Sequence, residues 1–515
     1  MRRLGGLRGF LAAALAVAIV APALDTAWTS RGPAHVSLVD PSLRAGEVAL
    51  VHTTAGRAGA LSTSLSRHGA TVIETDAAAD AVIARLSTEA LVSLSTDPSV
   101  TVATRDVAIV ATGSGRGGKV VFEKDREGDD DHGDTTSASR MPFASLNAMR
   151  APFAWTRTRG EGVTVAVMDS GIADHPDLAG KVKTRVDFVN DGSALQDPGG
   201  HGTFVAGLIA ASGGTVGVAP AASLVSLRVL DVQGNGTLAR VTKAFDWLLR
   251  NGKRYGVTGL SISWGAPQAT TYHKDFLSAL VEAAWFSGIT VVVAGGNDGP
   301  AAGSVTAPAT DPFVIAVGSY KDNGSPSSDD NELSTFTGRG PTLDGFAKPD
   351  TLAPGEHILG LRVPGLTYFD ASGEPIGSPT DRYVHMTGTS ASAGYLSGVA
   401  ALVKSARPSF GPNDVKAAIV ASGRSVRGTT VTAVDAPNAL VRTGTANAGL
   451  APSRLLLAIL TSSHQLRVNG VSWDGVSWDG ISWETVSWET VSWETVAWET
   501  VAWEGVSWED AVITE

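Results

Sequence analysis

Short apolar runs alternate with longer amphipathic segments between residues 141 and 448. The runs are rich in Val, Ile and Leu, which is typical of strands that are covered on both faces in a parallel sheet. The segments between and after them repeat apolar residues at helical spacing. The clearest runs are GVTVAVMD, SLVSLRVL, GLSISW, ITVVVAGG and PFVIAVGS. This pattern predicts a doubly wound α/β domain with a mostly parallel sheet over residues 141–448.

A shorter patterned unit precedes this domain. Between residues 45 and 108, strand-like and helix-like segments follow one another in the order β-α-β-β-α-β. We therefore expect a small α+β domain within residues 24–108. Few polar side chains converge in it, so we expect no chemistry there.

The first 23 residues predict an export signal. Three arginines precede an apolar run from Phe10 to Val20, and an A-x-A-like motif ends at Ala23. The alternative is an uncleaved anchor helix, but the run is short for a membrane span. We expect cleavage after Ala23 and a secreted or extracellular protein, either free or associated with the cell surface.

Two segments have the composition of linkers. Residues 109–140 are acidic and rich in Gly and Ser, and residues 449–470 precede the C-terminal repeats. Four aspartates, at 129–131 and 134, allow either a cation site or a solvated, cleavable linker. The polar composition favours the linker.

Composition narrows the class of protein. A chain of 515 residues with 43% hydrophobic and 18% charged residues suits a globular protein with several domains. The net charge of −11 argues against nucleic-acid phosphates as the main partner. The chain has no Cys, which excludes a thiolate nucleophile, a disulfide framework and a Cys zinc site.

Four polar residues fall at the ends of predicted strands or the starts of predicted helices, where open α/β sheets form their sites. They are Asp169, His201, Asn297 and Ser390. Each alone has a structural interpretation as a cap, turn or packing residue, and a Ser at a helix start is a good N-cap. Together they are the parts of an activated hydroxyl: a nucleophile, its base, a carboxylate that orients the base, and an oxyanion donor.

The motifs around these residues resemble those of secreted subtilisin-like serine proteases, the subtilases. DSGI with HPDL resembles the Asp motif, GGHGTFVAG the His motif, GTSASAGYLSG the Ser motif and AGGN the oxyanion segment. The resemblance covers about residues 141–448. It implies a subtilisin-like fold, catalytic Asp169, His201 and Ser390, and Asn297 at the oxyanion. The order Asp, His, Ser differs from that of chymotrypsin-like enzymes and α/β-hydrolases.

The resemblance implies further parts of a zymogen. Residues 24–108 resemble the family's propeptide, which assists folding and inhibits the active site until it is removed. VLDVQGNGT and SISWGAP resemble two substrate-binding edges, against which an extended peptide adds as a strand. The residues implied at these edges are Gly234, Gly236, Ser263, Trp264 and Gly265. No metal is expected in the chemistry; structural Ca²⁺ is common in the family, but no ligand set stands out in the sequence.

The chain also departs from the family's pattern. The family usually continues Met-Ala-x-Pro after the catalytic Ser, whereas residues 391–394 read ASAG. Phe204 replaces a usual His, and Ser261 replaces a usual Asn. None of these changes removes a catalytic group. We expect the large Trp264 to lie beside the pocket for P1, the residue whose carbonyl is attacked, so the preference at P1 stays open.

Residues 471–510 repeat the pentapeptide V-S-W-[DE]-[GT]. A period of five swaps the Trp between the faces of a strand and gives no stripe on a helix, whereas a solenoid with five residues per side would align the rings. Exposed tryptophans would form an adhesive surface. Binding to cell-wall polymer or glycan, self-association, packing onto the α/β domain, and a low-complexity tail without a fixed role all remain open.

The sequence thus predicts a secreted serine endopeptidase that is matured by propeptide removal and hydrolyses proteins or peptides through an acyl-enzyme, without a cofactor. One alternative is a catalytically weak or inactive surface protein of the same fold, which binds cell-wall or glycan partners through its Trp repeats. Another is an esterase with the same site. Proteolysis that depends on Ser390 would distinguish the endopeptidase from the inactive surface protein. Hydrolysis of peptides rather than esters would distinguish it from the esterase.

Overall fold

The computed structural model describes most of the chain between residues 38 and 456. The described ranges are 38–40, 42–54, 56–77, 80–112, 122–123, 144–322, 329–370, 372–378 and 381–456. The predicted signal peptide, most of the linker 109–140 and the repeats 471–510 lie outside them. Within the described ranges, no helix has both the length and the apolar character that a membrane span requires.

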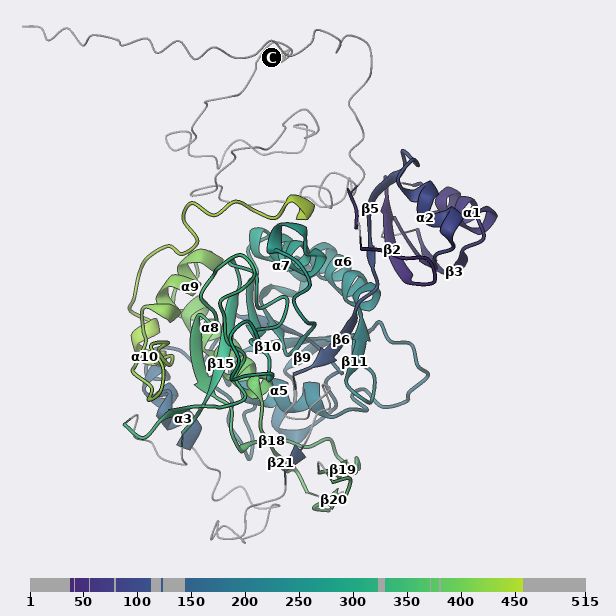
Figure 1. Cartoon of the computed structure of the whole chain (residues 1–515). Coiled ribbons are helices and arrows are strands. Elements are labelled where there is room, and N and C mark those ends of the chain that lie inside the picture. The colour runs from purple at the N-terminus through teal and green to yellow at the C-terminus, as the bar shows by residue number, and fades with distance from the viewer. Residues whose placement is uncertain are drawn as a thin grey trace, which may run out of the picture. The chain divides into compact units, whose positions relative to one another are not determined.

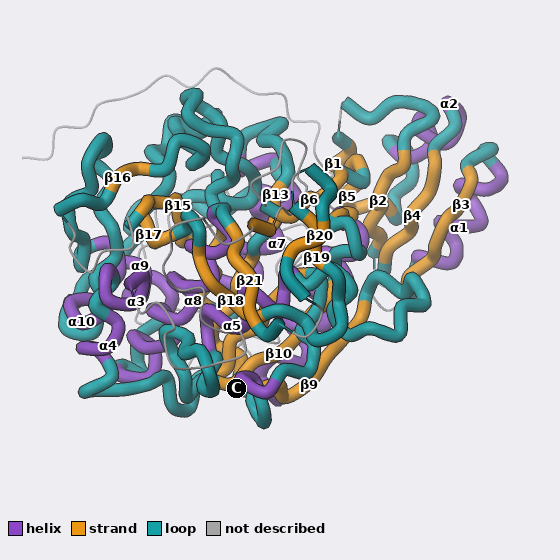
Figure 2. Tube along the Cα trace, turned by 90° about the horizontal axis from the view of Figure 1, so that it is seen from below, coloured by secondary structure: helices purple, strands orange, loops and turns teal. Residues whose placement is uncertain are grey.

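An eight-stranded sheet forms the centre of the α/β domain, as the apolar runs predict (Figure 2). In spatial order the strands are β16 (Glu332–Leu333), β15 (Ile315–Lys321), β14 (Thr290–Ala294), β12 (Val257–Ile262), β8 (Thr164–Asp169), β10 (Ser223–Arg228) and β9 (Val182–Asp187), and β17 (Thr351–Pro354) also pairs with β15. All these pairs are parallel except β15–β16. Strands β8 and β14 are buried along their whole length, because both faces of the sheet are covered.

Helices pack against this sheet in pairs (Figure 1). The pair α5 (His201–Ala210) and α8 (Thr389–Ala406) contacts β8, and the pair α6 (Leu238–Tyr255) and α7 (Phe276–Phe286) contacts β12 and β14. The described part of the domain also contains the α-helices α3 (Ala144–Ala148), α4 (Ala151–Ala154), α9 (Pro412–Val420) and α10 (Ala436–Ala439). Thr237 caps the start of helix α6, where its side chain accepts the Arg240 N–H, and Gly256 follows the end of the helix with a left-handed φ of 69°.

Residues 42–105 form a small α+β domain whose elements follow in the order that the sequence predicts. They are β2 (Val48–Thr53), α1 (Ala58–Arg67), β3 (Thr71–Asp76), β4 (Ala81–Arg85), α2 (Thr88–Leu94) and β5 (Val100–Arg105). The sheet order is β1-β5-β2-β4-β3, with β1 (Leu38–Val39) added in parallel to β5. Leu61 and Leu65 of α1 and Leu94 of α2 pack in one buried cluster with the sheet, so the domain has a core of its own.

A strand that the sequence does not predict follows this domain. Strand β6 (Ala108–Ala111) lies between β11 (Asn235–Thr237) and β13 (Trp264–Gly265) and is antiparallel to both. Figure 1 shows β6 beside β11. The linker predicted from residue 109 therefore begins later in the chain, because backbone hydrogen bonds on both sides hold residues 109–111 in a sheet. Two smaller sheets complete the fold. They contain β18 (Ile358–Leu361), β21 (Tyr383–Met386) and β7 (Phe122–Glu123), and β19 (Tyr368–Phe369) with β20 (Pro375–Ile376).

Candidate active site

The end of β8 and the start of α5 bring Asp169 and His201 together. Asp169 is the last residue of β8 and His201 is the first residue of α5, and both side chains are buried. Asp169 Oδ1 lies 2.7 Å from His201 Nδ1 and also accepts the Ser170 N–H at 2.7 Å. The carboxylate favours the tautomer with its proton on Nδ1, which leaves Nε2 to act as a base.

The surroundings of His201 raise its pKa above the ordinary value. Burial by itself lowers the pKa, because it disfavours the charged imidazolium. The charge and hydrogen bond of Asp169, and the charge of Asp197, outweigh burial. In the part of the chain that the structure describes, His201 Nε2 has no hydrogen-bond partner. His201 is thus a base of raised proton affinity with one ring nitrogen still to be engaged.

A buried aspartate that the sequence analysis missed, Asp197, holds the start of α5. Its Oδ1 accepts hydrogen bonds from Ser170 Oγ at 2.7 Å and the Gly200 N–H at 2.8 Å. Its Oδ2 accepts from the Thr203 N–H at 2.7 Å and Thr203 Oγ1 at 2.6 Å. These bonds satisfy groups at the helix start that have no partner within the helix. The placement of Asp197 in DPGGHG, four residues before His201, is the signal that could have revealed it.

Ser390 is the second residue of α8, and it does not cap the helix. Gly388 is the N-cap and α8 begins at Thr389. The Ser390 hydroxyl donates to the carbonyl oxygen of Thr112 at 2.9 Å, and Ser390 Oγ lies 2.8 Å from Thr112 Oγ1. The hydroxyl is thus engaged by Thr112 rather than by His201. Catalytic hydrogen bonds often form or tighten only during the reaction, so the missing bond to His201 does not exclude Ser390 as a nucleophile.

Asn297 follows β14 and faces the same carbonyl group. Its Nδ2 donates to the carbonyl oxygen of Thr112 at 2.6 Å. Its Oδ1 accepts hydrogen bonds from the Thr389 N–H at 3.0 Å and from Thr389 Oγ1 at 2.9 Å. These two bonds determine which end of the amide points toward Thr112. The Thr112 carbonyl therefore lies between an amide donor and the Ser390 hydroxyl.

Strand β6 fills the groove between β11 and β13, the two segments that the sequence predicts as substrate-binding edges. The Ala111 N–H donates to the Gly234 carbonyl, and the Thr112 N–H donates to the Ser263 carbonyl, both at 2.9 Å. The other predicted edge residues pair with β6 along its length: Gly236 with Ile109, Gly265 with Val110 and Trp264 with Ala111. All five residues expected at the two edges thus border β6. A peptide segment of this chain occupies the groove as its middle strand.

The side chain of Trp264 does not face β6, contrary to the expectation that it borders the P1 pocket. It is fully buried, and its indole N–H donates to the carbonyl oxygen of Met168 at 2.9 Å. A buried indole N–H needs such a partner, and the carbonyl near the end of β8 provides it. Only the backbone of Trp264 borders the groove.

The side chain of Thr306 fills the space between Gly265 and Gly296. A Cβ added to Gly265 would lie 2.5 Å from Thr306 Oγ1, and one added to Gly296 would lie 2.8 Å from the same atom. The backbone of Thr112 bonds to Ser263 on one side and to Asn297 on the other. Gly265 pairs with Val110 of β6, and Gly296 directly precedes Asn297, so the space that Thr306 fills lies beside β6.

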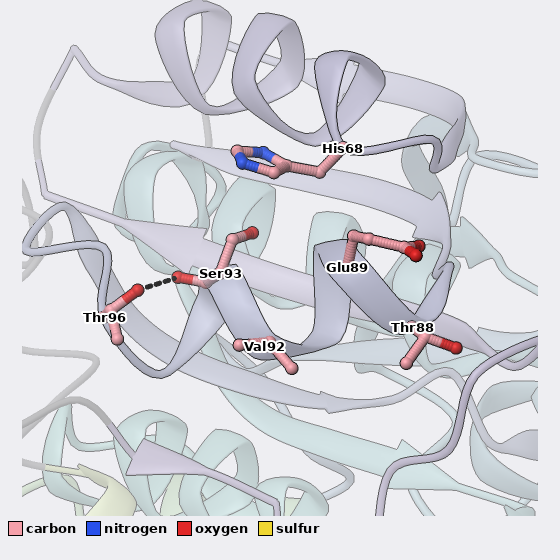
Figure 3. A pocket seen from close by; sticks show the side chains of 6 residues that line it. All are labelled: His68, Thr88, Glu89, Val92, Ser93 and Thr96. Atoms are coloured by element: carbon pink, nitrogen blue, oxygen red, sulfur yellow. Dashed lines mark hydrogen bonds between the residues drawn. The ribbon is translucent and has the colours of Figure 1, made fainter.

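A hollow lies on the small N-terminal domain. Figure 3 shows it between His68, which follows α1, and Glu89 and Ser93 of α2. Two of its hydroxyls bond to backbone carbonyls and not to His68 or Glu89: Ser93 Oγ donates to Ala90 at 2.8 Å and Thr96 Oγ1 to Ser93 at 3.1 Å. Among the described residues, no group of three or more His, Asp or Glu side chains is arranged to hold a metal ion.

Comparisons with known proteins place the α/β domain in a family. The family model described as the subtilase family matches residues 160–445. Serine protease AprX from Bacillus subtilis (strain 168) is 39% identical over 269 residues, which is 50% of this chain and 60% of that protein. Subtilisin Savinase from Lederbergia lenta is 35% identical over 277 residues, which is 53% of this chain and 87% of that protein. The chain thus spans about three fifths of AprX but most of the shorter relative.

A solved structure gives the same picture of the fold. Fervidolysin from Fervidobacterium pennivorans, described as a keratinolytic enzyme related to subtilisin, superposes with a TM-score of 0.61. The match covers 80% of this chain and 64% of that chain at 20% sequence identity. At this identity the likeness shows the fold alone.

Proposed function

The chain belongs to the subtilase family, and from this premise we propose that it is a secreted serine endopeptidase that matures by cutting its own chain. One observation carries the proposal. Strand β6 lies in the groove as an extended peptide, with the Thr112 carbonyl oxygen 2.6 Å from Asn297 Nδ2 and 2.9 Å from Ser390 Oγ. A bound peptide would present its carbonyl between the same two groups, and attack would then need the Ser390 hydroxyl to turn from the carbonyl oxygen toward His201 Nε2.

The proposed chemistry needs no metal or other cofactor. Ser390 Oγ attacks the carbonyl carbon while His201 Nε2 takes its proton, and Asp169 stabilises the resulting imidazolium. The Asn297 amide and the Ser390 N–H hold the oxyanion. The peptide C–N bond then breaks, and His201 gives the proton to the leaving amine. Water next attacks the acyl-enzyme, its proton passes through His201 to Ser390 Oγ, and a carboxylate product leaves.

The first bond cut in this proposal is Thr112–Gly113. Residues 24–112 would then form the propeptide, and β6 would stay in the groove as a bound product that inhibits the enzyme. Other contacts support this retention. Asp106 Oδ1 accepts the Ala239 N–H at the start of α6 at 3.0 Å, and the rings of His52 and Phe276 stack with centroids 5.3 Å apart. Removal of the whole segment is therefore needed before other substrates can enter.

The C-terminal repeats carry a second, separate proposal. Residues 471–510, which lie outside the described residues, present eight Trp-acid pairs, and we propose that they bind cell-wall polymer or glycan by ring stacking. Deletion of residues 471–515 should then abolish sedimentation of the protein with isolated cell walls and leave hydrolysis of short peptides unchanged. Equal sedimentation of both proteins would contradict it.

The experiment for the enzymatic proposal is fluorophosphonate labelling of purified protein, combined with intact-mass measurement. We expect the wild-type chain to be cut after Thr112 and, once the propeptide is removed, to be labelled at Ser390. Ser390→Ala should abolish both events. Ser397→Ala is a matched control, because Ser397 is another buried serine of α8, seven residues after Ser390.

Two outcomes would contradict the proposal. One is a wild-type protein that is free of its propeptide yet takes no label and hydrolyses no peptide; this would favour the catalytically inactive surface protein. The other is labelling with hydrolysis of esters but not of peptides, which would favour an esterase. Labelling and peptide hydrolysis that vanish in Ser390→Ala but persist in Ser397→Ala would support a serine endopeptidase.

A further inference from the structure

A second piece of the chain binds to the α/β domain ten residues after Thr112. Strand β7 (Phe122–Glu123) pairs in antiparallel register with β21, Phe122 opposite Met386 and Glu123 opposite His385. It forms the edge of the sheet β18-β21-β7. Figure 2 shows β21 and β18 running side by side above α5, the helix that begins at His201. This pairing holds the backbone of β7, and its two side chains make separate contacts.

Phe122 is inserted among aromatic side chains next to the catalytic helix. It is 5% exposed, and its ring meets Tyr368 edge to face with centroids 4.4 Å apart. A second edge contact joins it to Phe204 of α5 at 6.4 Å. Tyr368 in turn lies against the residue before His201, since a Cβ added to Gly200 would be 2.1 Å from the Tyr368 hydroxyl oxygen. Phe122 therefore packs against the layer that supports His201.

Glu123 meets a pair of histidines on the other side of the strand. Its Oε2 lies 2.9 Å from His357 Nδ1, and the rings of His357 and His385 stack in parallel with centroids 4.0 Å apart. His357 has a left-handed φ of 53°, and its N–H donates to Thr387 Oγ1 at 2.8 Å. A non-glycine residue keeps such a backbone only where its surroundings hold it. The site thus accepts an aromatic residue followed by an acidic one.

We propose that β7 is a second anchor that holds the chain on the leaving side of the Thr112–Gly113 bond, so that the first cut is made within one molecule. The inference rests on the proposed function, since it concerns the same bond. Strand β6 holds the acyl side in the groove, and β7 holds the amine side at β21. After the cut, the new N-terminal arm beginning at Gly113 stays attached to the α/β domain through Phe122 and Glu123.

Chain length sets the expected size of the effect. Nine residues, 113–121, separate the bond from β7, whereas 31 residues, 113–143, separate it from α3, the next described element. The entropic cost of bringing the two ends of a flexible loop together grows as about (3/2)RT times the logarithm of the number of residues in the loop. Loss of the β7 anchor alone should therefore slow the first cut by roughly sixfold.

The test measures the first-order rate at which the fragment ending at Thr112 appears when the full chain is refolded, read by intact mass at several protein concentrations. We expect the wild-type rate to be independent of concentration and Phe122→Ala to lower it by roughly sixfold. Glu123→Gln should lower it less, because backbone pairing and Phe122 remain. The matched control is Phe153→Ala, since Phe153 is a phenylalanine of α4 that is 62% exposed.

A folding defect is separated by a second measurement. The same substitutions in a Ser390→Ala chain, which stays uncut, should keep a cooperative thermal transition. A Phe122→Ala chain that folds and is cut at the wild-type rate would overturn the anchor, as would a wild-type rate that rises with concentration. A wild-type chain that is never cut after Thr112 would instead refute the maturation step itself, and the anchor with it.

Discussion

The side-chain amide of Asn297 donates a hydrogen bond to the carbonyl oxygen of Thr112 across 2.6 Å. The other end of that amide is held by two donors of Thr389, the residue directly before Ser390. The helix that carries the nucleophile in our proposal therefore also sets the direction of the oxyanion donor. A single helix start coordinates two groups that must act on the same carbonyl.

Replacement of Asn297 by Ala should lower kcat by roughly 10²–10³-fold with little change in KM, because the donor is most valuable when the oxygen carries charge. Hydrolysis of a short peptide by the processed protein measures both constants. Asn251→Ala is a suitable control, since Asn251 bonds to the Trp247 carbonyl on α6. A rise in KM by roughly 10²–10³-fold with an unchanged kcat would show that Asn297 only binds the substrate.

Replacement of Asp169 by Asn should both slow the first cut and move its pH dependence. The cut needs neutral His201, so its rate rises as pH increases through the pKa of His201, which Asp169 raises. Without that charge, burial lowers the pKa, and the inflection should move to lower pH. The plateau should fall by roughly 10⁴-fold, because the imidazolium is no longer stabilised. Rates of self-cleavage from pH 5 to 9 measure both effects, and an inflection at unchanged pH would contradict the role of Asp169.

The sequence predicts that Asp169, His201, Asn297 and Ser390 gather at one edge of the sheet. Each ends a predicted parallel strand or begins a predicted helix, and the carboxyl ends of such strands meet at one edge. The strand in the groove could not be predicted in this way. Strand β6 is a short apolar run before a Gly-rich stretch, and its partners in β11 and β13 lie more than a hundred residues away.

Side-chain direction was the other feature that the sequence could not supply. Trp264 lies in the segment expected at the groove, but its indole turns inward because the Met168 carbonyl offers the partner that a buried N–H requires. Asp197 was missed for a related reason. Its role depends on four donors of Ser170, Gly200 and Thr203 that converge only in the fold.

Replacement of Thr306 by Gly should enlarge the space for the P1 side chain. In the wild-type protein Thr306 fills the gap between Gly265 and Gly296, so we expect Ala, Ser or Thr at P1 to be preferred over Leu or Phe. The variant should raise kcat/KM for Phe at P1 relative to Ala by roughly 10–200-fold. Peptides that differ at P1 measure the ratio, and peptides that differ only at the position of Ile109 serve as the control. A wild-type preference for Phe would contradict the assignment.

The buried carboxyl groups of Asp311 and Glu282 should make the free energy of unfolding depend on pH. Burial raises the pKa of Asp311 to about 7, although Lys348 and Lys416 oppose the shift. Burial and the nearby Asp311 also raise the pKa of Glu282. Asp311 is therefore protonated in the folded protein at pH values where it is ionised in the unfolded chain.

Replacement of Asp311 by Asn should remove part of this dependence. The stability present below about pH 4 is lost as pH rises to about 7, because the folded state must then either hold the proton or bury the charge. Asn stays neutral and keeps an acceptor for the Phe313 N–H, which Asp311 Oδ1 binds at 2.9 Å. At pH 8 the midpoint of thermal unfolding of Asp311→Asn should exceed that of the parent by at least about 2 °C, with the difference shrinking toward pH 4. Both proteins are measured in a Ser390→Ala background to prevent autolysis. A difference that is constant with pH would mean that Asp311 does not change its protonation on folding.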